Sequence, residues 1–209
     1  MSNPFLHQPE KESKNLFAEI IEALIIALVF NIIVYFLFVI PSQVDGPSML
    51  PNLHDGELLF ANKMPTWFYN NTQTLDQLGW DYEYGDIVIF DYSNIVLVKR
   101  IIAKEGDRVM ITESGEVFVN GNKRYEDYLP ANLKTFLPQK GLRGFEPGEE
   151  VIVPAGHFFL MGDNRANSKD SRFAEVGFVK RENIKGVVFF RFWPLDKLGA
   201  FSKPTYQAK

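Results

Sequence analysis

Ser48 and Lys99 are of the two residue types that supply a nucleophile and its base. Ser48 lies in the run VDGPSMLP (residues 44–51), and Lys99 directly follows the apolar run IVLV (residues 95–98). A serine hydroxyl attacks a carbonyl carbon when a base removes its proton, and a neutral lysine amine can be that base. Together the two residues therefore predict serine-hydrolase chemistry with lysine as the base.

This chemistry requires Lys99 to lose its charge near neutral pH. Lysine has a reference pKa of about 10.4, and lowering it to roughly 8 disfavours the charged form by on the order of 3 kcal/mol. Burial among apolar groups has this effect. In an extended strand Lys99 shares a face with Leu97 and Ile95, which favours burial. On the strand alone, a lysine whose amine reaches solvent is the more common case.

The bend around Ser48 is predicted to be stiff. Pro47 fixes its own backbone and favours extended geometry at Gly46, so the hydroxyl of Ser48 is presented reproducibly. Pro47 has no N–H, but Ser48 keeps its own, and this backbone N–H is the predicted donor to an oxyanion. Read in isolation, Gly-Pro-Ser is more often a simple turn than a nucleophile.

A third cluster follows in the run GDNRANSKDSR (residues 162–172). Its acidic and arginine side chains can form hydrogen-bonded ion pairs around a loop. The simpler interpretation is a solvated polar loop.

Composition excludes several classes of function. The chain has 209 residues, a net charge of -4 with scattered basic residues, and no cysteine. A nucleic-acid surface, disulfides and thiolate chemistry are therefore not expected. His7, His54 and His157 lack the close spacing of a histidine metal site, so we expect neither a metal nor another cofactor.

An apolar segment near the N-terminus has the length of a membrane span. Residues 23–40 carry no charge, Ile20 and Ile21 extend the run, and Pro41 is expected to end the helix. We predict a retained transmembrane anchor over residues 16–40, rather than a cleaved signal sequence or a buried helix of a soluble protein.

The basic residues near this segment predict its orientation. Lys11 and Lys14 precede the span, and no Lys or Arg follows it before Lys63. The positive-inside tendency then places residues 1–15 in the cytoplasm.

The rest of the chain alternates short β-like runs with turn residues, and no other segment has a long helical period. The expected fold is mainly β: a single N-terminal transmembrane helix, then an antiparallel β-sheet core with a small inserted β subdomain. The predicted core comprises residues 41–106 and 150–209, and the insert comprises residues 107–149. The runs predicted as strands are residues 57–60, 86–90, 95–98, 108–112, 117–119, 150–154, 157–161 and 186–193.

Taken in order after the anchor, these segments resemble the type I signal peptidases, the bacterial leader peptidase family of membrane-anchored serine proteases with a Ser-Lys dyad. The matching runs are SMLP (48–51), GDIV (85–88), KRI (99–101) leading to Gly106-Asp107, GDNR (162–165) with Ser168, Asp170, Ser171 and Arg172, and the closing Trp193-Pro194.

The resemblance implies a role for each matched residue. Ser48 corresponds to the nucleophile, Lys99 to the general base and Ser168 to the hydroxyl that orients the lysine amine. Met49 is expected to line a shallow substrate pocket. The residues expected to form structural ion pairs near the site are Arg100, Asp163, Asp170 and Arg172.

The implied function is removal of N-terminal signal peptides from exported precursor proteins. Its partners would be secretory precursors and the lipid bilayer, with no nucleic acid, and we expect a monomer. The implied location is the bacterial cell (inner) membrane, crossed once, with a cytoplasmic N-terminus and an extracytoplasmic catalytic domain. The alternatives are a self-processing Ser-Lys protease like the SOS-response repressors, and a catalytically silent membrane-anchored protein that binds precursors.

Two positions depart from the family pattern. Gly46 stands where some members place a hydroxyl residue that helps to bind the oxyanion, so the second oxyanion donor is open. Ala103-Lys104-Glu105 replaces the usual Gly-x-Pro, which leaves the turn after Lys99 unpredicted.

Overall fold

The structure is a computed structural model that describes residues 16–67, 81–201 and 204. Contacts divide the chain into a unit that ends at Leu37 and a unit that begins at Phe38. The predicted cytoplasmic residues 1–15 lie outside the described residues.

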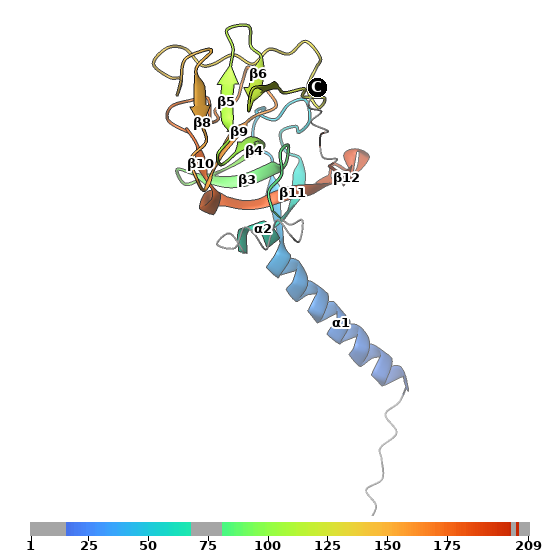
Figure 1. Cartoon of the computed structure of the whole chain (residues 1–209). Coiled ribbons are helices and arrows are strands. Elements are labelled where there is room, and N and C mark those ends of the chain that lie inside the picture. Colours follow the sequence, from blue (N-terminus) through green and yellow to red (C-terminus); the bar gives the residue numbers. More distant parts are fainter. Residues whose placement is uncertain (1–15, 68–80, 202–203, 205–209) are drawn as a thin grey trace, which may run out of the picture. The chain divides into compact units, whose positions relative to one another are not determined.

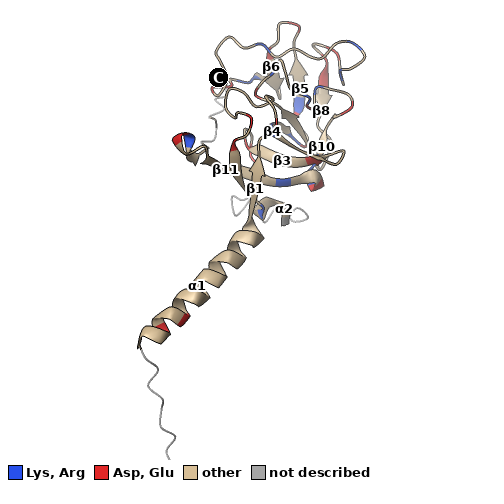
Figure 2. Ribbon diagram, turned by 180° about the vertical axis from the view of Figure 1, so that it is seen from behind, with Lys and Arg blue, Asp and Glu red and all other residues tan. Residues whose placement is uncertain are grey.

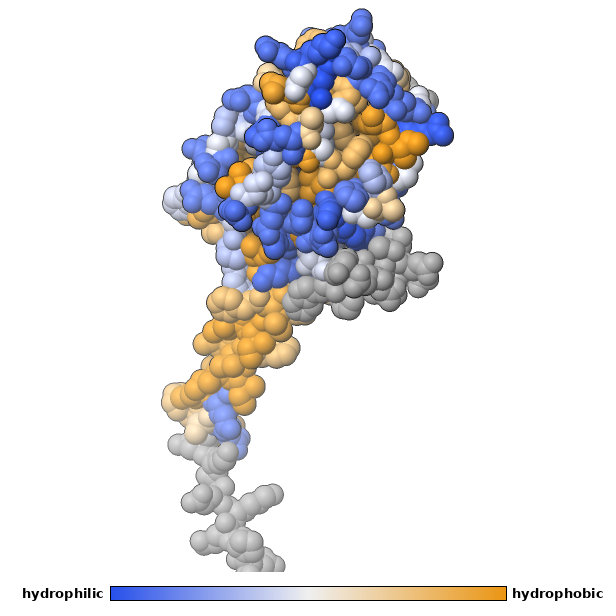
Figure 3. All heavy atoms as spheres, turned by 90° about the vertical axis from the view of Figure 1, so that its left-hand side faces the viewer, coloured by the Kyte–Doolittle hydropathy of each residue, from blue (hydrophilic) through white to orange (hydrophobic). Residues whose placement is uncertain are grey.

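The first unit contains one long apolar helix, α1, from Leu16 to Phe38. Its most apolar stretch of 18 residues has a mean hydropathy of 2.7, and at about 1.5 Å rise per residue the 23 residues of the helix are long enough to cross a hydrocarbon core of about 30 Å. Figure 3 shows its apolar surface, and Figure 2 shows acidic residues only toward its N-terminal end. Asn31 donates its side-chain N–H to the carbonyl of Ala27 at 3.1 Å, which satisfies the amide within the helix.

The helix ends two residues before the predicted boundary at Ile40, and not at Pro41. Val39 and Ile40 belong instead to strand β1 (Val39–Gln43), where they pair with Asn62 and Ala61. Hydrogen bonds to β2 satisfy the backbone N–H and C=O groups of these two residues, in place of the hydrogen bonds of a helix.

The second unit is built on an antiparallel sheet in the order β1-β2-β11-β3-β4-β9-β10, with β12 paired to β11 (Figure 1). Strand β11 lies between β2 and β3, which are consecutive strands in the sequence. Beyond β1, the strands are β2 (Leu58–Asn62), β3 (Ile87–Tyr92), β4 (Ile95–Lys104), β9 (His157–Met161), β10 (Val179–Lys180), β11 (Ile184–Trp193) and β12 (Gly199–Ala200). The short helices are α2 (Met64–Trp67), η1 (Arg181–Asn183) and η2 (Leu195–Lys197).

A second, smaller sheet has the order β7-β6-β5-β8. Its strands are β5 (Arg108–Ile111), β6 (Val117–Val119), β7 (Asn122–Lys123) and β8 (Glu150–Ile152). The predicted hairpin of β5 and β6 is confirmed, and Asn120 and Gly121 adopt positive φ in the turn that follows. β8 pairs with β5, so the smaller sheet continues past residue 149, where the insert was predicted to end.

The two sheets share one hydrophobic cluster. Val109, Ile111 and Phe145 of the insert pack in the same cluster as Ile102 of β4 and Phe159 of β9. Apolar contact of this kind is the main source of folding free energy. The insert is therefore bound to the core strand that carries Lys99.

Candidate active site

Ser48 lies in a compact turn after β1. The Gly46 N–H donates to Asp55 Oδ1 at 2.8 Å, and the Leu50 N–H donates to the carbonyl of Pro47 at 3.1 Å. Gly46 has φ +79°, not the extended geometry predicted before a proline. Glycine has no Cβ, so it adopts this left-handed conformation without strain.

Met49 anchors the turn in the core. Its side chain is 0% exposed and packs in the same cluster as Leu53 and Leu59. The predicted place of Met49 in the wall of a substrate pocket stays a prediction, and in this structure the residue packs in the core.

Lys99 points at Ser48. Its Nζ lies 2.7 Å from Ser48 Oγ and donates to the carbonyl of Val98 at 2.8 Å. The residue is 2% exposed, and burial lowers the pKa of Lys99 to about 8, although the carboxylates of Asp170 and Asp163 oppose this. The arrangement can transfer a proton from the hydroxyl to the amine.

The burial of Lys99 comes from the sheet rather than from its apolar neighbours along the strand. Ile95 is 55% exposed, because it ends the β3–β4 hairpin opposite Tyr92, beyond the core. Lys99 lies farther along β4, opposite Val88, where the strand is buried on both faces.

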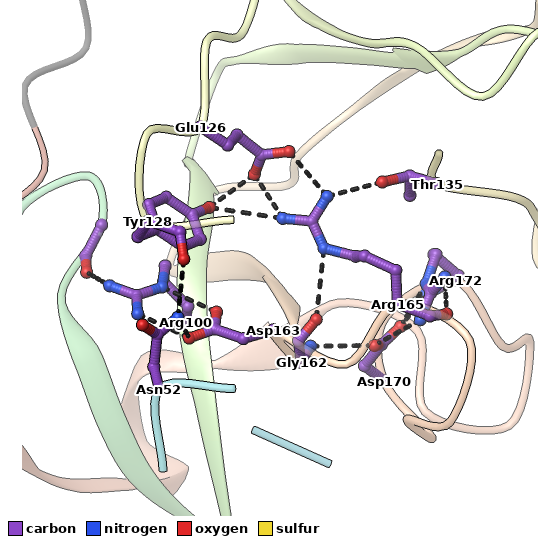
Figure 4. Close-up of polar contacts among 11 residues, drawn as sticks. Asn52, Arg100, Glu126, Tyr128, Thr135, Gly162, Asp163, Arg165, Asp170 and Arg172 are labelled. Carbon is purple, nitrogen blue, oxygen red and sulfur yellow. Dashed lines mark hydrogen bonds and ion pairs between the residues drawn. The ribbon is translucent and has the colours of Figure 1, made fainter. Parts of the chain in front are cut away.

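The run from Gly162 to Arg172 forms a loop that is held by two buried ion pairs (Figure 4). Arg100 donates to both carboxylate oxygens of Asp163, at 2.8 and 2.6 Å. Arg172 likewise donates to both oxygens of Asp170, at 2.8 and 2.8 Å. Both carboxylates are nearly inaccessible, so this is not a solvated polar loop. Two parallel hydrogen bonds between a guanidinium and a carboxylate fix the distance and angle between the two side chains.

Asn164 joins this loop to the serine turn. Its backbone N–H donates to the carbonyl of Ser48 at 3.0 Å, and its side chain donates to the carbonyl of Pro47 at 3.1 Å. The sequence analysis did not single out Asn164, because an asparagine in a polar run carries no signal of its partner.

Ser168 lies beside the serine turn but is not bonded to Lys99. Its Oγ is buried and has no hydrogen-bond partner among the described residues. A Cβ placed on Gly162 would lie 2.2 Å from this Oγ and 2.4 Å from the carbonyl oxygen of Ser48. Gly162 therefore allows Ser168 and the serine turn to approach one another.

The backbone N–H of Ser48 is available for a ligand, since it has no acceptor within the described part of the chain. The N–H of Gly46 is not, because it is bonded to Asp55. The structure thus leaves the Ser48 N–H as a donor for the oxyanion and excludes that of Gly46.

The turn after β4 forms without the family's usual residues. Asp107 accepts the N–H of Lys104 at 2.7 Å, and Gly106 supplies a positive φ of 80°. Asp107 also accepts bonds from Tyr84 at 3.1 Å and Asn120 at 2.7 Å. A buried carboxylate closes the turn in place of proline.

The chain is similar to several known proteins. The family model described as signal peptidase, peptidase S26, matches residues 17–193. Signal peptidase I T of Bacillus subtilis (strain 168) is 37% identical over 90% of this chain and 91% of its own length. Signal peptidase IB of Staphylococcus aureus (strain Mu50 / ATCC 700699) is 35% identical over 86% of this chain and 91% of its own.

Among solved structures, a signal peptidase I from Enterococcus faecalis V583 is 28% identical, with a TM-score of 0.40, and the match covers 51% of this chain and 96% of that one. The family model spans the chain from the apolar helix to the end of β11, and the two relatives each match most of the chain. The chain belongs to the signal peptidase family, peptidase S26.

Proposed function

We propose that this protein is a membrane-anchored signal peptidase in which Ser48 is the nucleophile and neutral Lys99 the general base. One observation carries the proposal: the Lys99 amine lies 2.7 Å from Ser48 Oγ in a nearly solvent-free position. With a pKa of about 8, roughly one tenth of the amines are neutral at pH 7, which is sufficient for a base.

The reaction begins when Ser48 Oγ attacks the carbonyl carbon of the scissile bond and its proton passes to Lys99 Nζ. The Ser48 N–H donates to the oxyanion that forms. The Lys99 ammonium then gives its proton to the leaving amine, which leaves an acyl-enzyme on Ser48. Lys99 next takes a proton from water as the water attacks the ester carbonyl. When the ester bond breaks, Lys99 gives this proton to Ser48 Oγ, and the carboxylic acid product is released.

Ser168 is proposed to orient the amine during these steps. An ammonium has three N–H donors, and two of those of Lys99 go to Ser48 and Val98. The buried Oγ of Ser168 lacks a partner, so it is a suitable acceptor for the third.

The substrates are proposed to be secretory precursors, cut after their signal peptides. α1 anchors the enzyme in the bacterial cell membrane, with the N-terminus in the cytoplasm and the catalytic unit outside. An anchor confines enzyme and precursor to one bilayer, which raises their effective concentration.

Family membership disfavours the alternative of a self-processing repressor-like protease, and the contact between Ser48 and Lys99 disfavours that of a silent binding protein. A precursor whose signal peptide ends in Ala-x-Ala separates these functions. The full chain in detergent should cleave it at one site, without prior cleavage of itself.

Replacing either dyad residue tests the mechanism. Ser48→Ala and Lys99→Ala should each lower kcat by about 10⁴-fold or more while the protein stays folded. The matched controls are Ser114→Ala and Lys185→Ala, whose side chains lie on exposed parts of the smaller sheet and of β11. The controls should cleave like the wild type, and cleavage by either dyad variant at the wild-type rate would refute the assignment.

A further inference from the structure

The insert reaches the active site through a segment between β7 and β8. Three of its residues, Glu126, Tyr128 and Thr135, contact two arginines of the core, and we call these three residues the brace. Figure 4 shows Glu126 and Thr135 around the guanidinium of Arg165, with Tyr128 beside Arg100. None of the three brace residues belongs to the motifs that define the dyad.

Arg165 is held from several directions. Its Nη1 donates to Glu126 Oε2 and to Thr135 Oγ1, each at 2.6 Å, and its Nη2 donates to the other Glu126 oxygen. Its Nε donates to the carbonyl of Gly162 at 3.2 Å, and its own carbonyl accepts a bond from Arg172 at 2.7 Å. The Arg165 side chain is 1% exposed, so water does not compete for these bonds.

Tyr128 connects this ion pair to the other arginine. The guanidinium carbon of Arg100 lies 3.9 Å from the centre of the Tyr128 ring, and the Tyr128 hydroxyl donates to Glu126. The side-chain amide of Asn52 donates to the Tyr128 carbonyl and to Asp163, both at 2.9 Å. Tyr128 thus contacts Arg100 of β4, Asn52 of the serine turn and the ion pair between Glu126 and Arg165.

The two arginines are direct neighbours of the groups that matter for catalysis. Arg100 follows Lys99 on β4, and Arg165 follows Asn164, which bonds the carbonyls of Pro47 and Ser48. We propose that the brace sets the position of Ser48 relative to Lys99, with Glu126 and Tyr128 as positioning residues for the reaction. This inference rests on the proposed function of the dyad.

The nature of the contacts supports positioning over simple stabilisation. The cost of removing two charges from water offsets much of the attraction between them, so a buried ion pair adds little net stability. Its parallel bonds nevertheless fix distance and angle. A shift of about 1 Å in a reacting group can cost about 10²-fold in rate.

Glu126→Gln is the first test, in the full chain in detergent with an Ala-x-Ala precursor. It should lower kcat by about 10²-fold and change KM by less than about twofold, because substrate binding is kept while the position of Ser48 relative to Lys99 is disturbed. The matched control is Glu116→Gln, which breaks the exposed Lys123–Glu116 ion pair on the same insert. That control should leave both constants unchanged.

Arg165→Lys is the second test, because it keeps the charge and loses the planar fork. Looser packing admits water to Lys99, so its pKa should rise from about 8 and the acid limb of kcat/KM should move to higher pH. Wild-type kcat in both variants would overturn the inference. So would a lowered melting temperature without a change in kcat or in the acid limb. If Ser48→Ala is inactive in the same assay, such a result rejects the brace alone and leaves the dyad in place.

Discussion

Lys99 must lose its charge in the fold in order to act as a base. Its pKa of about 8 means that the folded protein disfavours the ammonium by about 3 kcal/mol relative to water. The carboxylates of Asp163 and Asp170 stabilise the ammonium and so raise the pKa of Lys99. Because Arg100 and Arg172 pair with these carboxylates, their negative charges are partly neutralised and Lys99 can lose its proton near pH 8. The two ion pairs thus help to keep the pKa of Lys99 low without taking part in proton transfer.

Replacing this lysine with an apolar residue should stabilise the protein. Between pH about 8 and 10.4 the unfolded chain binds the Lys99 proton and the folded chain does not, so the contribution of Lys99 to stability rises with pH. Lys99→Met should therefore be more stable than wild type at pH 7 by about 1–3 kcal/mol, and this advantage should shrink by pH 10. Urea unfolding of both proteins at pH 7 and pH 10 measures this difference in stability. An equal or lower stability of the variant at pH 7 would show that burial of the ammonium is not costly here.

At the scale of elements, the site is the meeting of three segments: the serine turn after β1, strand β4, and the loop after β9. The closest approach is at Gly162, whose missing side chain leaves room for Ser168 and for the carbonyl of Ser48. One of these contacts is with backbone, which cannot rotate away as a side chain can.

Gly162→Ala should therefore separate the loop from the serine turn. We expect kcat to fall by about 10²-fold and stability to fall by about 1–3 kcal/mol, since the Cβ would lie 2.4 Å from the Ser48 oxygen. Gly199→Ala is the control, because a Cβ there has no neighbour within 4 Å and the backbone needs no glycine. Full activity of the Gly162 variant would mean that the loop tolerates displacement.

The strands were predictable from local patterns where apolar runs end in turn residues. β3, β5, β6 and β9 lie within one or two residues of the predicted runs. β1 was missed because its first two residues, Val39 and Ile40, continue the apolar run of α1, and only pairing with β2 distinguishes strand from helix there. β4 extends to Lys104 because it pairs with β3 as far as Arg100 and with β9 from Arg100 to Lys104, which no local pattern reveals.

The candidate site was predictable only in part, for a similar reason. Ser48 and Lys99 were identified by chemistry and by resemblance, and the structure brings them into contact. Asn164, Glu126 and Tyr128 depend on partners far away in the sequence, so their roles become visible only in three dimensions. The burial of Met49 was not predicted, because an apolar residue beside a nucleophile can face either a substrate or the core.

For the whole molecule, the connection between the anchor and the catalytic unit is short. α1 ends at Phe38 and β1 begins at Val39. From Phe38 to Ser48 is ten residues, and an extended chain of that length spans at most about 36 Å. In the proposed function, this short connection suits substrates that emerge from the same bilayer.

The proposed orientation can be tested directly because the chain has no cysteine. A cysteine introduced by Lys140→Cys, at an exposed position of the insert, should react with a membrane-impermeant maleimide on intact spheroplasts. One introduced by Ser13→Cys should react only after lysis. The reverse labelling pattern would place the catalytic unit in the cytoplasm.

The position of β11 between β2 and β3 has a consequence for biosynthesis. Strands that are made early cannot complete their hydrogen bonding until one of the last strands of the chain arrives. Until then β2 and β3 each carry an open edge, which is a template for wrong pairing. A ribosome that stalls before Ile184 would therefore leave a nascent chain that holds both dyad residues but has no sheet to bring them together.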